Sequence, residues 1–237
     1  MFSLIGKKVG MTQLFSETGE LVPVTVIEVA PNLVVDIKTQ ERNKYSALVV
    51  GYGEIREKLV NKPLTGQYKK AGKGVRRHVY ELKGLDSSKY QIGDLISFEN
   101  LFKIGDLIDV QGTTKGHGFT GAIKLWNFRC GPKSHGAGYP HRFGGSLETG
   151  RGGSAAQKVW KGKKMGGRYG SELVTAVNLE IVHTDQEKKL IFLRGCVPGK
   201  PEGIVKLKPT TRKRKQVSAP FKIYKNKSID ESASVQQ

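Results

Sequence analysis

The sequence predicts a mainly β protein whose strands are interrupted by a long, glycine-rich, basic insertion. Three observations support this fold class. Short runs rich in β-branched residues alternate with turn residues in the first half of the chain. The pattern disappears between residues 112 and 168, and it returns between residues 174 and 208. We therefore expect one β-domain that needs both flanks of the insertion to complete its sheet.

The strand predictions rest on β-branched runs bounded by turn signals. The first run reads LVPVTVIEV and ends before Pro31 and Asn32. We expect strands at residues 21–29, 33–39, 46–51, 78–83, 94–99, 105–111, 174–183, 189–195 and 203–208. A hairpin turn is expected at residues 185–187, and the basic residues 65–74 are expected to form a loop. Short runs at close spacing favour an antiparallel meander or a barrel.

The charge of the chain indicates a polyanionic partner. Its 237 residues include 40 Lys or Arg and 21 Asp or Glu, for a formal net charge of +19 at pH 7. Such an excess attracts polyanions, and nucleic acid is the usual one. No apolar run reaches the roughly 18 residues needed to cross a bilayer, and residues 1–8 lack the apolar segment of a secretory signal. We therefore expect a cytoplasmic protein, with a mature organellar form less favoured.

The insertion, residues 112–168, has an unusual composition. It holds 15 of the 30 glycines, 11 Lys or Arg and a single acidic residue, Glu148. A disordered linker would not carry its six aromatic residues, Phe119, Trp126, Phe128, Tyr139, Phe143 and Trp160. An independent domain would need more aliphatic core than its four Val, Ile and Leu residues supply. The remaining interpretation is an arm whose tertiary partner is RNA.

Each residue type in the insertion suits that partner. Lys and Arg neutralise the densely packed phosphates of folded RNA, which would repel carboxylates. Glycine lets the backbone approach phosphates and adopt positive φ. Aromatic rings and Arg guanidinium planes stack on unpaired bases.

The residues expected to contact RNA are basic, tryptophan and histidine side chains of the insertion, together with two lysines near the N-terminus. They are Lys7, Lys8, Lys115, Lys124, Trp126, Arg129, Lys133, His135, His141, Arg142, Arg151, Lys158, Trp160, Lys161, Lys163, Lys164 and Arg168. For the two tryptophans, RNA contact and anchoring of the base of the arm are equally open. Met11 is expected in the core.

Enzymatic and metal sites find little support. Residues 116–121 match GxGxxG, but no Asp or Glu occurs between Asp109 and Glu148 to supply the acid of a dinucleotide site. The spacing of His117, Cys130, His135 and His141 fits no zinc pattern, and Cys196 lies far away in the sequence. We expect no catalytic residue, no bound metal and no cofactor. Ser-His-acid catalysis would need an acid from outside the insertion.

Several collinear stretches resemble the universal large-subunit ribosomal protein three family, bacterial type. They are LIGKKVGMT at residues 4–12, DVQGTTKGHGF at 109–119, GPKSHG at 131–136, VWKGKKMGG at 159–167 and RGCVPG at 194–199. The resemblance implies a translation-protein-type β-barrel with a central extension that reaches toward the peptidyl transferase centre. It also implies early binding to large-subunit ribosomal RNA, a role in subunit assembly, and no enzymatic activity. One departure is Thr149, which stands where many bacterial members carry a glutamine that can be methylated.

The predicted organisation follows. Residues 1–111 and 169–208 form the globular β-barrel domain, residues 112–168 the RNA-threading extension, and residues 209–237 a basic to polar tail. The expected partners are large-subunit ribosomal RNA and neighbouring ribosomal proteins, without a membrane or a small-molecule substrate. The alternatives are an RNA-binding or RNA-chaperone protein outside the ribosome, an enzyme acting on nucleotides or nucleic acid, and a membrane-surface protein.

Overall fold

The computed structural model describes residues 3–85, 89–99, 101–147 and 159–211. The chain divides into two compact units. We call the first, formed by residues 1–113 and 173–237, the globular unit. The second, Thr114–Glu172, is the inserted unit.

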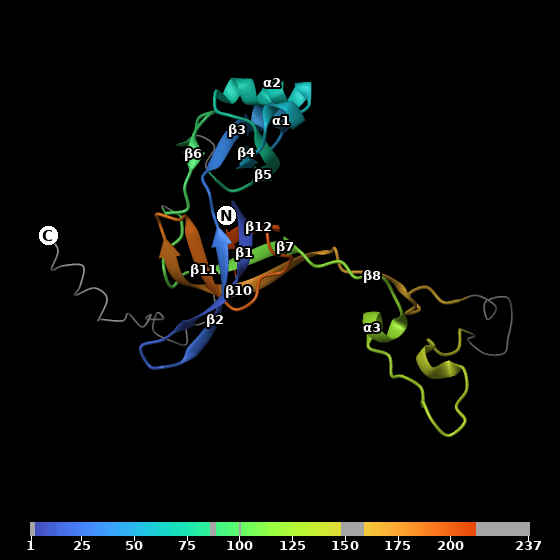
Figure 1. The fold of residues 1–237 in the computed structure, drawn as a ribbon. Helices are drawn as coiled ribbons and strands as arrows, with labels where there is room; N and C mark the ends of the chain where they lie inside the picture. Colours follow the sequence, from blue (N-terminus) through green and yellow to red (C-terminus); the bar gives the residue numbers. More distant parts are fainter. Residues whose placement is uncertain (1–2, 86–88, 100, 148–158, 212–237) are drawn as a thin grey trace. The chain divides into compact units, whose positions relative to one another are not determined.

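Six antiparallel strands of the globular unit close into a barrel in the order β1-β12-β7-β10-β11-β2. Their bounds are Leu4–Phe15 for β1, Leu21–Glu28 for β2, Leu107–Thr113 for β7, Leu173–Asp185 for β10, Leu190–Arg194 for β11 and Ile204–Pro209 for β12. In Figure 1 the blue strands from the beginning of the chain lie among orange strands from its end. The prediction of a mainly β fold that needs both flanks of the insertion is therefore confirmed, and the structure selects the barrel over the meander.

The other strands of the globular unit form a separate sheet in the order β5-β4-β3-β6. These strands are Asn32–Lys38 for β3, Ala47–Glu54 for β4, Arg76–Leu82 for β5 and Leu95–Ile96 for β6. The helices α1 (Gln40–Asn43), η1 (Glu57–Leu59) and α2 (Lys62–Ala71) lie between strands of this sheet in the chain, and α1 and α2 are drawn beside it in Figure 1. The sequence pattern had not separated these strands from those of the barrel.

Helix α2 corrects the expectation of a loop at residues 65–74. Tyr68 and Ala71, three residues apart, are buried on one face of the helix. The Tyr68 hydroxyl donates a hydrogen bond to the Arg76 carbonyl oxygen at 3.0 Å. Gly72 ends the helix in the left-handed conformation, with φ 65°. The helix was missed in the sequence because polar and basic residues surround the two buried positions.

The barrel and the second sheet share one hydrophobic core. Leu4 and Ile5 of β1 belong to the same buried cluster as Val34 of β3 and Leu48 of β4. The side-chain amide of Asn32 donates to the Ile5 carbonyl oxygen at 3.2 Å and so joins the two sheets. Because this apolar surface is common to both sheets, they stabilise one another.

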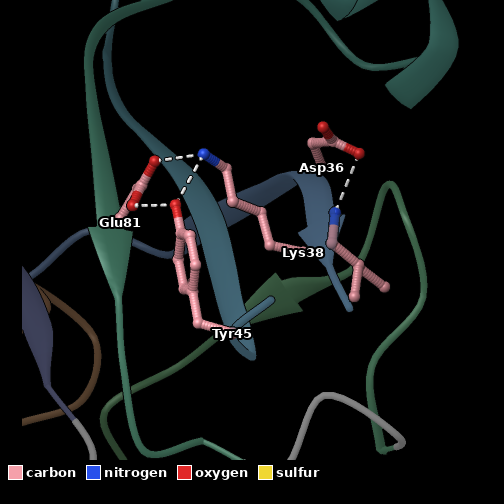
Figure 2. Close-up of polar contacts among 5 residues, drawn as sticks. Asp36, Lys38, Tyr45 and Glu81 are labelled. Carbon is pink, nitrogen blue, oxygen red and sulfur yellow. Dashed lines mark hydrogen bonds and ion pairs between the residues drawn. The ribbon is translucent and has the colours of Figure 1, made fainter. Parts of the chain in front are cut away.

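A polar network crosses the second sheet (Figure 2). The Lys38 ammonium lies 2.5 Å from a Glu81 carboxylate oxygen and 2.9 Å from the Tyr45 hydroxyl, which donates to the other Glu81 oxygen at 3.0 Å. The hydrogen bonds from Lys38 and Tyr45 lower the pKa of Glu81, and the bond to Glu81 raises the pKa of Lys38. The Lys83 ammonium lies 5.2 Å from the centre of the Tyr45 ring.

Strand β1 was not predicted, because its residues do not alternate cleanly between apolar and polar. Gly6 lies close to β2, and a Cβ atom there would come within 2.8 Å of Ile27 Cγ2. The expectation that Met11 belongs to the core is wrong, since this residue is 52% exposed. Strand β1 pairs with β12 only over residues Leu4–Lys7. Beyond Gly10, β1 pairs with β2 alone.

Candidate nucleic-acid interface

The inserted unit is organised by a small two-stranded sheet. Strand β8 (Gly118–Thr120) pairs antiparallel with β9 (Gly167–Tyr169), so that Phe119 lies opposite Arg168. Helix α3 (Ala122–Trp126) follows β8, and the 3₁₀ helix η3 (Pro140–Arg142) lies further along the chain. These short elements hold the described parts of the unit in a defined arrangement without a large core.

The ends of the inserted unit are held together by backbone contacts. The Thr114 amide donates to the Glu172 carbonyl oxygen at 2.9 Å, and the Glu172 amide donates to the Thr114 hydroxyl at 3.2 Å. Gly170 has φ +74°, and a Cβ atom on it would lie 2.1 Å from the Lys115 carbonyl oxygen. Only glycine fits at this position.

Aromatic rings reinforce the same end of the unit. The His117 ring stacks on Tyr169 with ring centres 4.9 Å apart and an angle of 19° between the planes. The His117 amide also donates to the Tyr169 carbonyl oxygen at 2.9 Å. His117 therefore packs within the inserted unit, so its position inside the GxGxxG match has a structural explanation that needs no dinucleotide.

Trp126 links the two described segments of the inserted unit. Its indole nitrogen donates to the Met165 carbonyl oxygen at 2.7 Å, and the Lys164 ammonium lies 5.4 Å from its ring centre. Trp126 as a whole residue is 42% exposed. This geometry supports the anchoring role for Trp126 and leaves part of the ring accessible. Trp160, in contrast, is 69% exposed.

The segment around η3 is folded back on itself. The Nδ1 atom of His141 donates to the Pro132 carbonyl oxygen at 2.8 Å, and the Gly131 amide donates to the His141 carbonyl oxygen at 2.9 Å. His135 is exposed and has a left-handed backbone, with φ 59°. An open pocket of about 710 Å³ lies alongside; its lining residues are Phe128, Arg129, Cys130, Gly131, Pro132, Phe143, Gly144 and Gly145.

A contact between the two segments involves the basic run near residue 161. The Lys163 ammonium donates to the Ser146 carbonyl oxygen at 2.8 Å. Lys163 and Lys164 therefore combine exposed charge with contacts inside the unit. Their amino groups help to shape the interface as well as to charge it.

The described surface of the inserted unit is strongly cationic. Its exposed basic residues are Lys115, Lys124, Arg129, Lys133, Arg142, Lys161, Lys163, Lys164 and Arg168. Glu172, at the very end of the unit, is the only acidic residue among residues 114–147 and 159–172. Such a distribution produces a positive potential that favours phosphate and repels carboxylates.

Three aromatic residues should be added to the predicted contact set. Phe119, Tyr139 and Phe143 are all exposed, and Phe119 retains 84% of its surface in solvent. Each has a glycine next to it in the sequence. The sequence did offer a signal for these residues: a glycine stands beside each aromatic residue in a segment that lacks the periodicity of a core. Exposed rings of this kind suit base stacking.

The two predicted contacts outside the insertion lie on β1 and differ from one another. The Lys7 ammonium is 3.7 Å from a Glu202 carboxylate oxygen. Lys8 is buried, and its ammonium donates to the carbonyl oxygens of Val197 at 2.7 Å and Gly199 at 3.3 Å. This environment argues against a phosphate contact by Lys8.

Two predicted contacts, Arg151 and Lys158, lie outside the described residues, as do Glu148 and Thr149. Within the described ranges, no group of three or more His, Cys, Asp and Glu residues is placed to hold a metal ion. None of the helices described is both long and apolar enough to cross a membrane.

The chain is similar in sequence to known ribosomal proteins. A family model described as Ribosomal protein L3 matches residues 81–189. The large ribosomal subunit protein uL3 of Mycoplasmoides gallisepticum is 47% identical over 236 residues, which cover 100% of this chain and 99% of that protein. The proteins of the same name from Ureaplasma parvum and Mycoplasma pneumoniae are 48% and 44% identical over 220 residues, or 93% of this chain. Those matches cover 93% and 76% of the two relatives.

Proposed function

The chain belongs to the ribosomal protein L3 family, and on that premise we propose that it is a structural constituent of the large ribosomal subunit. Proteins of this family are ribosomal components and not enzymes. The relatives are bacterial, so the ribosome in question is that of a bacterial cytoplasm.

The inserted unit is the part of the chain that we propose binds large-subunit ribosomal RNA. One observation carries this proposal: exposed Lys and Arg residues cover the described unit, and its one described acid stands at its end. A surface so charged is self-repelling in the free protein and becomes favourable when phosphates surround it. The exposed rings of Phe119, Tyr139 and Trp160 add surfaces on which bases can stack.

The two units have separate roles in this proposal. The globular unit, which corresponds to the predicted β-barrel domain of residues 1–111 and 169–208, anchors the protein on the subunit. The inserted unit, which corresponds to the predicted extension of residues 112–168, threads into folded RNA, aids early assembly and reaches toward the peptidyl transferase centre. Short hydrogen bonds within the inserted unit, such as that from Trp126 to Met165, support an arm that enters RNA with part of its shape already set.

Sedimentation tests the proposal. Tagged protein from a lysate is run through a gradient after a wash at about 0.5 M salt, where screening is short-ranged. We expect near-stoichiometric recovery with the large subunit, because a threaded arm is retained kinetically. Release into the light fractions would contradict the proposal and indicate a reversible RNA binder outside the ribosome.

A shortened protein provides the matched control. Thr113 and Leu173 are directly paired across β7 and β10, so a two-residue Asn-Gly turn can replace residues 114–172. The strands of the barrel and its core remain in this variant. We expect it to fold, as shown by cooperative unfolding, and to be released from the subunit by the salt wash. Equal retention of the variant would assign the binding to the globular unit.

A further inference from the structure

The β1–β2 hairpin continues beyond the closed part of the barrel. Strand β1 pairs with β12 only through Lys7, whereas its pairing with β2 continues to Phe15 opposite Leu21. Directly opposed residues share a face of the ladder, and residues two apart along a strand do the same. The two faces of the hairpin can therefore be compared.

One face of the hairpin is packed against strands β10 and β11 of the barrel. Leu14, Val22 and Val24 lie on it, in a cluster with Val182 and Phe192. Val22 and Val24 are buried, as apolar residues on a half-buried strand should be. The register thereby accounts for the apolar residues of this face.

The opposite face is apolar and open. Met11, Phe15 and Leu21 lie on it, and each is 51–52% exposed. Pro23 is exposed on the same face, and Gln13 is its polar member. Further along the strand this face turns inward, because Thr25 and Ile27 are buried. The inward-facing apolar pattern of the barrel thus continues past the barrel's end, where it meets solvent.

The charge of the hairpin is opposite to that of the inserted unit. Residues 9–27 contain no Lys or Arg, although the chain as a whole carries +19. The turn holds two exposed carboxylates, Glu17 and Glu20. A phosphate backbone brought to this surface would be repelled by the two carboxylates, and no Lys or Arg of residues 9–27 would compensate that repulsion.

We propose that the open face of the β1–β2 hairpin docks a second protein of the large subunit. The partner surface is apolar at its centre and carries Lys or Arg where it meets Glu17 and Glu20. Apolar contact at the centre with complementary charge at the rim is the usual composition of a protein interface. A second copy of this chain would place carboxylates against carboxylates. The inference rests on the proposed ribosomal function, which supplies the partner.

Photo-crosslinking in assembled subunits tests the docking. Phe15→p-benzoylphenylalanine is introduced into tagged protein, large subunits containing it are purified and irradiated, and the adducts are identified by mass spectrometry. We expect one ribosomal protein, attached through an apolar segment flanked by Lys or Arg. The same group at Leu59, which is 70% exposed on η1, is the control and should not yield that adduct.

Each other outcome overturns the docking. An adduct with RNA would show that the face contacts nucleic acid despite its carboxylates. An adduct within this chain, including residues 212–237, would show that the chain covers its own hairpin. Irradiation without an adduct would show that the face stays in solvent. Recovery of the tagged chain with the subunit is scored separately, so failure of the proposed function is distinguished from failure of the docking.

A pair of variants measures the strength of the contact. Met11→Ser with Phe15→Ser removes the two large side chains that β1 contributes to the open face, and Leu59→Ser is the matched control. We expect the partner identified by crosslinking to be retained about tenfold less well after a salt wash, because truncated interface anchors cost at least that factor. Recovery of this chain should not change. Equal retention of the partner in both variants would contradict the proposal.

Discussion

The indole nitrogen of Trp126 donates a hydrogen bond to the Met165 carbonyl oxygen at 2.7 Å, across 39 residues of the chain. The contact joins the end of α3 to the segment that leads into β9. It gives a unit with little core a fixed point between its two described segments.

Replacement of this tryptophan tests its anchoring role. Trp126→Phe keeps an aromatic ring and removes the N–H donor, so we expect a loss of about 1 kcal/mol in local stability. Hydrogen exchange of the amides of residues 162–168 should become several-fold faster. Trp160→Phe changes an exposed ring and should leave these rates unaltered. Unchanged exchange in Trp126→Phe would show that the hydrogen bond does not hold the segment.

Gly170 provides a second test of the base of the inserted unit. In Gly170→Ala the new Cβ would lie 2.1 Å from the Lys115 carbonyl oxygen in a backbone with φ +74°. The backbone must move, and we expect a cost of about 2 kcal/mol or more. Faster exchange at the amides of β8 and β9 would report it. Gly144→Ala adds a Cβ with nothing within 4 Å and is the control. A Gly170 variant as stable as that control would contradict the predicted clash.

The salt dependence of RNA binding tests the electrostatic role of the inserted unit. One variant replaces three exposed lysines of the inserted unit together by Gln: Lys124, Lys133 and Lys161. It leaves Lys163 and Lys164 unchanged, because their ammonium groups also make contacts inside the unit. For each phosphate that the variant no longer neutralises, the slope of log affinity against log salt should fall by about 0.7–0.9. Titration of transcribed large-subunit RNA at several salt concentrations measures this slope.

The control for that titration carries the same change of charge elsewhere. Lys58, Lys69 and Lys70 are exposed on η1 and α2 of the globular unit, and all three are replaced by Gln. We expect a smaller change of slope in this variant. Equal changes in the two variants would show that total charge, rather than the inserted unit, governs binding.

Glu81 makes stability depend on acid pH. Its pKa is lowered from 4.5 by the hydrogen bonds from Lys38 and Tyr45, so its contribution is complete above 4.5 and is lost as pH falls through the lower folded-state value. The Glu81 side chain is 42% exposed, and solvent screening limits the effect to under about 1 kcal/mol.

Denaturant unfolding at pH 7 and at pH 3 measures this contribution. Wild type should be more stable than Glu81→Gln at pH 7, and the difference should shrink at pH 3. Glu57→Gln removes an exposed carboxylate on η1, outside the network, and is the control. A difference between wild type and Glu81→Gln that stays constant with pH would show that the network does not depend on ionised Glu81.

Arg151 tests the proposed reach of the extension. The resemblance to the ribosomal protein three family implies that the extension ends near the peptidyl transferase centre, and we expect the Gly-rich run of residues 150–154, which contains Arg151, at or beside its tip. Arg151 lies outside the described residues. Arg151→Ala should disturb the reaction centre more than incorporation, with peptide bond formation slowed roughly two- to tenfold, or about 0.4–1.4 kcal/mol in activation free energy. Sedimentation measures incorporation, and single-turnover peptide transfer measures the rate. Failed incorporation with normal translation by the incorporated copies would show that the tip is misassigned.

The strands and the insertion could be predicted because each has a local signature. β-Branched runs between turn residues identified the strands around Val26, Val49 and Ile191, since an extended chain needs such side chains over only a few residues. The basic, glycine-rich composition of residues 112–168 indicated RNA for an equally local reason, because charge and backbone freedom belong to individual residues. The sequence by itself therefore determined most strands of the globular unit and the position of the insertion, and it predicted RNA as the partner.

Only the tertiary structure decided which strands are neighbours. Val205 lies opposite Gly112 in the barrel, and Leu4 lies opposite Leu207, although each pair is far apart in the sequence. A strand's own residues do not specify a distant partner, so the closed barrel, the separate second sheet and the burial of Lys8 were not predictable. The same holds for Met11, whose apolar side chain looks like a core residue in the sequence. Met11 is exposed because the β1–β2 hairpin extends beyond the closed part of the barrel and its register turns Met11 to the open face. That register is set by long-range strand pairing and not by the local sequence.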